Sequence, residues 1–174
     1  LRFEYGRALL DAGREDQAVP VFQALVESGS QRPRVLNTAV VLGLRSGDDR
    51  LALTALRRLR QSDRALTPRS LLLEGRLLRR LDRLAESRAV FNRGVRAYPD
   101  NVALRYARAM TRIAAGDRAG GEADLRAIIA DDPEHAEALN ALGYTLVDQT
   151  DRIDAGAGLI ERAYRLRPDA PAII

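Results

Sequence analysis

The chain has 174 residues, of which 46% are apolar and 30% are charged, and it contains no Cys, no Trp and a single His. This length and apolar content are enough for one domain of ordinary size and exclude a disordered segment. Without Cys the chain has no disulfide, no thiolate nucleophile and no Cys-based zinc site. No apolar run is long enough to span a bilayer.

In chain order, helical patterns fill five segments, near residues 1–32, 33–67, 68–101, 102–135 and 136–169. Each segment is predicted to hold two amphipathic helices separated by a turn. The turns are predicted at residues 12–16, 46–49, 81–83, 115–118 and 149–152. Thr67-Pro68 and Asp132-Pro133 each predict a capping side chain followed by Pro at the first helical position. No stretch alternates with period two over a useful length, so strands are not predicted.

Three series of residues recur along the chain with a period of 34 or 35 residues. One series of mostly small residues is Gly6, Val40, Gly75, Ala109 and Gly143. A second small series is Ala18, Ala52, Ser87, Gly121 and Gly156. A third series is large and apolar and consists of Phe22, Leu56, Phe91, Leu125 and Ile160. Three series with one period indicate a repeated helix–turn–helix unit.

This unit, with a small residue at positions 8 and 20, a large apolar residue at 24 and Pro near 32, resembles the tetratricopeptide repeat (TPR). The third segment shows the pattern in Leu71, Gly75, Leu78, Ser87, Phe91, Gly94 and Pro99. The fifth fits with one residue inserted near Asp151–Arg152. The resemblance covers residues 1–174 as one domain of about five repeats. It implies an all-α, right-handed superhelical solenoid of antiparallel helix pairs.

Two segments depart from the pattern. The first lacks its opening residues and carries Pro20 within its second helix, where Pro loses a backbone hydrogen bond. The fourth has Arg105, Arg108 and Arg112 where apolar residues are expected. We therefore expect the first helix of the fourth repeat to be rotated by about one position.

The C-terminal third narrows the resemblance. "ALNALGYTL", "LIERA" and "RPDAPAI" are similar to a group of proteobacterial TPR proteins of the cell envelope. Several of these are lipid-anchored adaptors, and one presents substrates to a periplasmic carboxy-terminal processing protease. The resemblance implies an adaptor whose partner is such a protease or its substrates. It favours a periplasmic or outer-membrane-associated location, with the cytoplasm left open.

The two ends of the chain give a further expectation. The chain opens at Leu1 within a helical pattern and closes on "DAPAII", which is typical of the start of a helix. We expect a segment of a longer protein, with residues 170–174 beginning a further first helix. Both ends are then expected to expose apolar surface and to favour end-to-end association.

The TPR resemblance also implies which residues line a binding groove, because family positions 2, 5, 9, 12 and 13 of each first helix usually face the concave side. The candidate partner-binding residues are Arg34, Asn37, Arg45, Arg69, Arg76, Arg79, Arg80, Tyr106, Arg108, Asn140 and Tyr144. This set predicts a central basic band, with Asn and Tyr towards its C-terminal side, that binds an acidic peptide of another protein. The alternative is a solvated helix face.

No catalytic or metal-binding pattern is found. His135 is the single imidazole and lies in "DDPEH", where a solvated residue in a first helical turn is the expected role. The nearby acids lack the Gly and bidentate Glu of a calcium loop. The glycine-rich stretch 116–125 lacks the Lys-Ser/Thr of a phosphate-binding loop. We therefore predict a non-catalytic chain without a cofactor or metal, while a catalytic domain elsewhere in a longer protein stays open.

The charge is uneven along the chain. Every basic residue is Arg, and residues 50–96 carry thirteen Arg against four acids. The alternative function is therefore binding of nucleic acid or another polyanion through this Arg-rich middle segment. We do not favour it, because many of these arginines fall on second helices and interleaved aromatic residues are missing.

Overall fold

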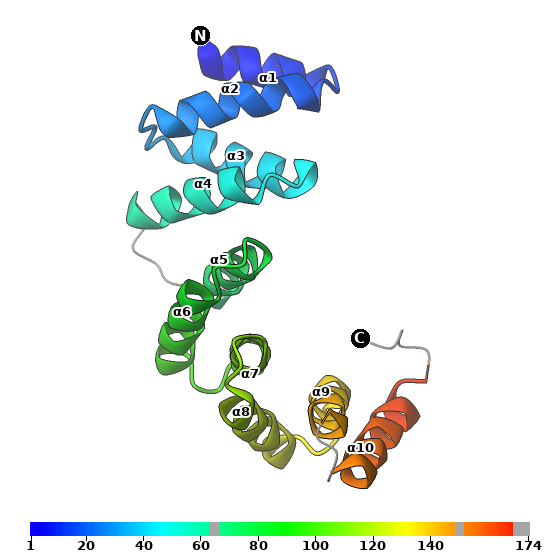
Figure 1. Cartoon of the computed structure of the whole chain (residues 1–174). Helices are drawn as coiled ribbons and strands as arrows, with labels where there is room; N and C mark the ends of the chain where they lie inside the picture. The colour runs from blue at the N-terminus through cyan, green and yellow to red at the C-terminus, as the bar shows by residue number, and fades with distance from the viewer. Residues whose placement is uncertain (63–66, 149–151, 169–174) are drawn as a thin grey trace. The chain divides into compact units, whose positions relative to one another are not determined.

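The computed structural model describes residues 1–62, 67–148 and 152–168, and these form ten α-helices (Figure 1). The first unit of chain holds α1 (Arg2–Asp11), α2 (Glu15–Glu27), α3 (Pro33–Ser46), α4 (Asp49–Ser62) and α5 (Pro68–Arg80). The remainder holds α6 (Leu84–Ala97), α7 (Val102–Ala114), α8 (Arg118–Asp131), α9 (Ala136–Val147) and α10 (Ile153–Leu166). None of the described residues lies in a strand, so the all-α prediction is confirmed.

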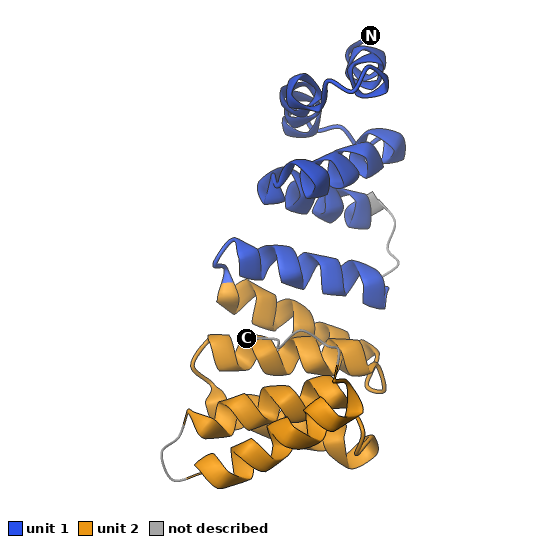
Figure 2. Ribbon diagram, turned by 90° about the vertical axis from the view of Figure 1, so that its right-hand side faces the viewer, with its two compact units in different colours: residues 1–83 blue, residues 84–174 orange. Residues whose placement is uncertain are grey.

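The helices divide between two compact units, residues 1–83 and 84–174 (Figure 2). Within each unit, helices that are consecutive in the chain contact one another, as α3 does α4 and α9 does α10. Successive pairs also contact, because α2 packs on α3 and α8 packs on α9. Each pair therefore covers the apolar side of the next, as a repeat protein requires.

Each unit has its own core. In unit 1 the largest fully buried side chains include Phe22, Leu36 and Leu71. In unit 2 a core cluster joins α7, α8 and α9 through Ala109, Leu125, Ile128, Ala138, Ala141, Leu142 and Leu146. Phe22 and Leu125 belong to the apolar 34-residue series, and both are 0% exposed. The sequence period therefore marks core positions.

The small residues of the repeat lie where paired helices approach closely. A Cβ added at Gly156 would lie 2.6 Å from the carbonyl oxygen of Gly143. A Cβ at Gly121 would lie 2.9 Å from the carbonyl oxygen of Ala109. The second repeat differs, because there Gly43 rather than Val40 faces Ala52, whose backbone nitrogen lies 2.7 Å from an added Cβ. The close contact has moved one turn along α3, which leaves Val40 free to fill the core.

Of the two predicted helix starts with a capping side chain before Pro, one is confirmed. Thr67 caps α5 by accepting from the backbone nitrogen of Ser70 at 3.2 Å, and Pro68 is the first helical residue, as predicted. The Asp132-Pro133 prediction is wrong, because Asp132 ends α8 and His135 caps α9. The Asp132 carboxylate accepts from the backbone nitrogen of Glu134 at 3.1 Å, which stabilises a turn instead of a helix.

The predicted rotation of α7 is wrong. Ala109 keeps the same close approach to Gly121 that Gly143 keeps to Gly156, so the helix has the ordinary register of the repeat. The arginines of α7 are accommodated by acids on the facing side of α8, as described below. Pro20 does lie within a second helix, α2, which continues through it.

Three further predictions concern membrane crossing, the C-terminal end and the superhelix. Among the described residues, no helix is long and apolar enough to cross a membrane. The predicted helix start at residues 170–174 lies outside the described residues. The right-handed superhelix stays a prediction.

Candidate partner-binding surfaces

The exposed face of α3 carries every candidate residue predicted on this helix. Arg34, Asn37 and Arg45 are all exposed, and Val41 between them is 55% exposed. Their spacing places them on one side of the helix, opposite the buried side that includes Leu36 and Gly43. The face is therefore mixed, with an apolar centre between polar side chains.

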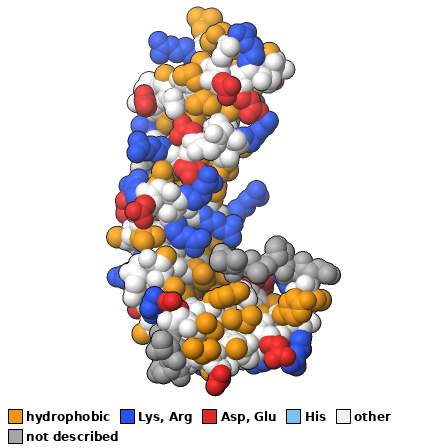
Figure 3. Space-filling view, turned by 45° about the vertical axis from the view of Figure 1, so that its right-hand side comes forward, with side chains coloured by type: hydrophobic (Ala, Val, Ile, Leu, Met, Phe, Trp, Pro, Cys, Tyr) orange, Lys and Arg blue, Asp and Glu red, His pale blue; other side chains and the backbone are white. Residues whose placement is uncertain are grey.

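The exposed face of α5 is more basic. Arg69, Arg76, Arg79 and Arg80 are all exposed. The opposite side is buried and consists of Leu71, Glu74, Gly75, Leu77 and Leu78. In the space-filling view, blue side chains gather at the level of this helix (Figure 3). The arginines of the predicted basic band in unit 1 thus lie on one side of α5, together with Arg34 and Arg45 on α3.

Two of the predicted band residues are engaged inside unit 1. Arg80 donates from Nε to the carboxylate of Asp49 on α4 at 2.8 Å, and Arg45 pairs with Glu15 on α2. Both pairs join the last turn of a first helix to the first residue of the preceding second helix. These two guanidinium groups are therefore part of the packing between repeats.

The other four arginines of the band are differently placed. Within the described part of the chain, no ion pair is formed by Arg34, Arg69, Arg76 or Arg79. Their guanidinium groups are exposed to solvent and have fork geometry that suits carboxylates. This subset is the part of the band best placed to meet an external anion.

In unit 2, the corresponding surface is more apolar. The ring of Tyr106 on α7 stacks on His135, with centroids 6.3 Å apart and an interplanar angle of 20°. Tyr106 also packs on the core cluster together with Met110. On α9, Tyr144 is 41% exposed and Asn140 is half-buried one turn before it. Apolar side chains gather on this lower part of the molecule (Figure 3).

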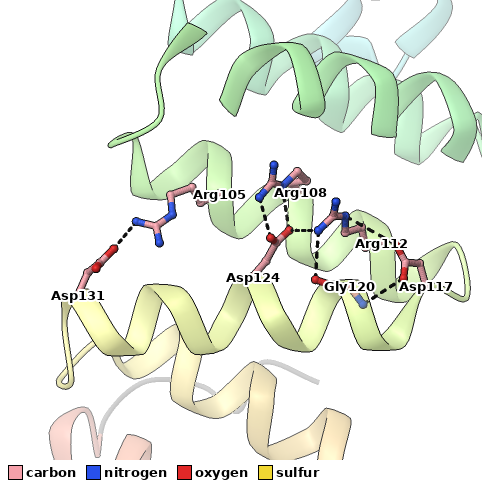
Figure 4. A network of polar contacts seen from close by, with 7 residues as sticks. All are labelled: Arg105, Arg108, Arg112, Asp117, Gly120, Asp124 and Asp131. Carbon is pink, nitrogen blue, oxygen red and sulfur yellow. Dashed lines mark hydrogen bonds and ion pairs between the residues drawn. The ribbon is translucent and has the colours of Figure 1, made fainter. Parts of the chain in front are cut away.

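Arg108 lies on another side of α7 from Tyr106 and is held in a polar network (Figure 4). The carboxylate of Asp124 on α8, which is 8% exposed, accepts from Nε and Nη2 of Arg108 at 2.8 and 2.6 Å. It also accepts from Nη1 of Arg112 at 2.9 Å. Arg105, near the start of α7, pairs with Asp131 at the end of α8 at 2.5 Å. The network ties α7 to α8 within one repeat.

A second buried carboxylate was not identified from the sequence. Glu74 on α5 is 2% exposed and accepts from Nε of Arg57 on α4 at 3.0 Å, and it also pairs with Arg60. Glu74 is one of four acids in the Arg-rich middle segment. The sequence gives no signal for this contact, because Glu74 lies on α5 and its arginine partners lie on α4. Only the packing fixes the register between these two helices. Part of the positive charge of this segment is therefore compensated internally.

His135 has a structural contact rather than a catalytic arrangement around it. Its Nδ1 accepts from the backbone nitrogen of Ala138 at 3.2 Å and lies 3.4 Å from the carboxylate of Glu137. This places the ring over the N-terminus of α9, as a cap. In the parts of the chain that the structure covers, no three His, Asp or Glu side chains are grouped so that they could hold a metal ion.

Known proteins share both the sequence pattern and the fold. The tetratricopeptide repeat family model matches residues 42–102 and 106–171. The TPR repeat-containing protein PA4667 of Pseudomonas aeruginosa is 41% identical over 103 residues, which are 59% of this chain. The same match spans 18% of the length of that relative.

Solved structures are similar over almost the whole chain. MamA of Desulfovibrio magneticus RS-1, from residue 41 to its end, has a TM-score of 0.71 at 15% identity, covering 97% of this chain and 96% of that one. YrrB, described as a TPR protein with an unusual peptide-binding site, has a TM-score of 0.69 at 15% identity. It is matched over 97% of this chain and 86% of its own. These likenesses show a helical repeat solenoid.

Proposed function

Because the chain belongs to the tetratricopeptide repeat family, whose fold supports protein–protein interaction in general, we propose that it binds an acidic peptide segment of a partner protein on its first helices. The observation that carries this proposal is the exposed face of α5. Three of its arginines, Arg69, Arg76 and Arg79, are exposed and form no ion pair within the described residues.

The chemistry of this face favours a carboxylate-bearing segment. Guanidinium groups form two parallel hydrogen bonds with a carboxylate, and several on one helix side match a run of acidic side chains. Half-buried Leu72 and Leu73 lie between the arginines, so an apolar side chain of the peptide also has a contact. Binding of this kind weakens with salt, because the charges are exposed.

The remaining candidates extend the proposal to the other helices. On α3, Asn37 offers an amide to a peptide backbone next to exposed Val41. In unit 2, Tyr106, Asn140 and Tyr144 supply aromatic faces and an amide, which suit a less charged part of a ligand. Arg45, Arg80 and Arg108 each pair with an acid of another helix, so we assign them a role in contacts between helices.

The proposed role is that of a non-catalytic adaptor without a cofactor in the bacterial cell envelope. The support for this setting is the resemblance of the C-terminal third to envelope TPR adaptors, including one that serves a periplasmic protease. The partner proposed on that ground is a periplasmic protease or its substrate. Fractionation of source cells, followed by immunodetection with an antibody against this chain, tests the location. Recovery in the cytosolic fraction alone would contradict it.

The peptide proposal is tested with fluorescein-labelled 12-residue peptide pools of acidic, neutral and basic composition. Fluorescence anisotropy at low and moderate salt should show preferential binding of the acidic pool. The variant Arg76→Glu/Arg79→Glu should weaken it by about tenfold or more. Both positions are exposed and form no ion pair within the described residues, unlike Arg80, which pairs with Asp49.

A matched control is the variant Arg88→Glu/Arg96→Glu on α6. These two arginines are also exposed, form no ion pair within the described residues, and lie on a second helix. The control makes the same change in net charge and should retain acidic-peptide binding. Equal loss in both variants would indicate a nonspecific charge effect, and equal binding of neutral peptides would contradict the acidic preference.

The nucleic-acid alternative is separated by a labelled single-stranded oligonucleotide in the same assay. A protein that uses the Arg-rich middle segment for a polyanion would bind the oligonucleotide with steep salt dependence. It would also bind more weakly in both charge-reversed variants. We expect weak oligonucleotide binding, because Arg57 and Arg60 in this segment are paired with Glu74.

A further inference from the structure

Unit 1 contains a cleft of about 470 Å³ on the second helix of a pair, separate from the exposed first-helix faces. Leu53 of α4 lines it, and so do four polar residues of the same helix, Thr54, Arg57, Arg58 and Gln61. Their spacing of three, four and seven residues puts them on one side of that helix. Three stretches of chain form the cleft, because the turn between α2 and α3 contributes Gln31 and the segment after α5 contributes Arg83.

Arg58 links two of the stretches of chain that form the cleft. Nη1 of Arg58 lies 3.6 Å from the position that a Cβ would take at Gly29, so this guanidinium reaches the turn that carries Gln31. Leu53, which is 3% exposed, supplies an apolar part of the lining. The cleft volume falls within the range of small-molecule sites.

The polar groups of the lining are mainly hydrogen-bond donors. Three guanidinium groups, two side-chain amides and one hydroxyl line the cleft, and none of the described lining residues is acidic. Arg57 donates from Nε to buried Glu74 at 3.0 Å, which fixes the orientation of its guanidinium. Glu74 also pairs with Arg60, so one carboxylate serves two cations. An anion is therefore favoured here.

We propose that this cleft binds a small phosphorylated ligand. A phosphate group carries up to two negative charges and three terminal oxygens, which match several guanidinium forks better than a single carboxylate does. The cleft is larger than one phosphate group, so the rest of the ligand has room along Leu53 and the arginine stems. The site is independent of the peptide surface on α5, because no residue is shared between them.

The probe is inorganic pyrophosphate, titrated into the full 174-residue chain by calorimetry and by backbone-amide NMR. We expect saturable binding with shifts centred on residues 54–61 and on Gln31. The variant Arg58→Gln/Arg83→Gln should weaken binding by about tenfold or more. Thr54→Val should weaken it less, and because it keeps the side-chain shape it guards against a folding artefact.

The matched control is Arg50→Gln, also on α4 and exposed but outside the cleft lining. It should bind pyrophosphate like the wild type, and so should the peptide-site variant Arg76→Glu/Arg79→Glu. Urea unfolding of each variant verifies that the fold is retained.

Several outcomes would overturn the proposal. They are NMR shifts that avoid the cleft, equal weakening by Arg50→Gln, and binding of citrate as tightly as pyrophosphate. A phosphoserine peptide that binds the cleft about tenfold more tightly than pyrophosphate would show that the ligand is a protein. That result would also replace the small-ligand proposal, whatever the acidic-peptide assay on α5 gives.

Discussion

Asp124 on α8 accepts two hydrogen bonds from one guanidinium, that of Arg108 on α7, at 2.8 Å from Nε and 2.6 Å from Nη2. Because the carboxylate is 8% exposed, this is a mostly buried ion pair whose partners depend on one another. The pair explains how α7 keeps its register although arginines occupy positions where the repeat expects apolar residues.

The substitution Asp124→Ala should lower the free energy of unfolding by about 3 kcal/mol, because it leaves Arg108 and Arg112 without their shared acceptor. Asp131→Ala on the same helix is the control, since Asp131 is 63% exposed in its pair with Arg105. It should cost less than about 1 kcal/mol. Urea unfolding monitored by circular dichroism measures both, and similar losses would argue against a special role for the buried pair.

Two glycines of α10 should respond oppositely to replacement by Ala. At Gly156 the added Cβ would lie 2.6 Å from the carbonyl oxygen of Gly143, so α9 and α10 must separate, at a cost of about 2 kcal/mol or more. At Gly158 an added Cβ would have no contact within 4 Å beyond its own stretch of helix among the described residues, and Ala should stabilise the helix by about 0.5–1 kcal/mol. Thermal unfolding of both variants measures these two stability changes. A stabilised Gly156→Ala would refute the close contact.

The two inter-repeat arginines of unit 1 should differ in importance. Arg80 binds Oδ2 of Asp49, which is 8% exposed and whose Oδ1 has no hydrogen-bond partner among the described residues. Arg45 binds Glu15, whose side chain is 30% exposed. Arg80→Gln should therefore cost about 1–3 kcal/mol, and Arg45→Gln less than about 1 kcal/mol, in urea unfolding. The reverse order would mean that exposure does not set the strength of these pairs.

Glu122 on α8 should make stability depend on acid pH. Its carboxylate accepts from Nη2 and Nη1 of Arg152 at 2.8 and 2.9 Å, and this bonding lowers its pKa below 4.5. Burial raises the pKa of Glu122 and so partly opposes this effect, whereas the hydrogen bond from Arg126 lowers it further. The folded state then binds the proton less readily than the unfolded state does. The stabilisation is present above the unfolded pKa and is lost as pH falls through the folded pKa.

The variant Glu122→Gln should accordingly be less stable than the wild type at neutral pH, and the difference should shrink as pH falls below the unfolded pKa and through the lowered folded pKa. Unfolding free energies from urea titrations at closely spaced pH values measure this. Parallel curves for the two proteins would show that Glu122 does not contribute to the pH dependence.

The association predicted for the chain ends has a structural counterpart on α10. Ile153 is 50% exposed and Tyr164 is 63% exposed, and their separation of eleven residues places them on one side of the helix. Sedimentation equilibrium should show association that depends on concentration and is weakened by Tyr164→Arg. Tyr144→Arg on α9 serves as the control and should leave association unchanged. Equal behaviour of all three proteins would exclude this surface.

The sequence predicted the helices and their exposed faces well, because both depend on periodicity within one helix. Arg34, Asn37 and Val41 share the exposed side of α3 for that reason. It did not predict that Arg80 meets Asp49 or that Glu74 meets Arg57, since these contacts depend on the register between helices.

The sequence misled at α7 for a related reason. The predicted rotation treats arginine as a solvent-facing residue, whereas the compensating Asp124 lies sixteen residues after Arg108 on another helix. The cleft on α4 cannot be predicted from periodicity, because Gln31 and Arg83 come from turns that no helical period connects to α4. The repeat period predicts which positions of a repeat are buried or exposed. The specific polar contacts arise where the repeats differ in sequence, so the period does not predict them.

The ion pairs between repeats also bear on how such a chain can be recombined. In the pairs Glu15–Arg45 and Asp49–Arg80, a second helix begins with an acid that meets Arg in the last turn of the next first helix. In the pair Arg118–Asp148 the charges are reversed, and Asp148 directly follows α9. Transplanting the second or third repeat into the fifth position would set Arg45 or Arg80 against Arg118. Repeats of one family are thus not freely interchangeable at this contact, and a transplant avoids two facing arginines only if both partners are changed together.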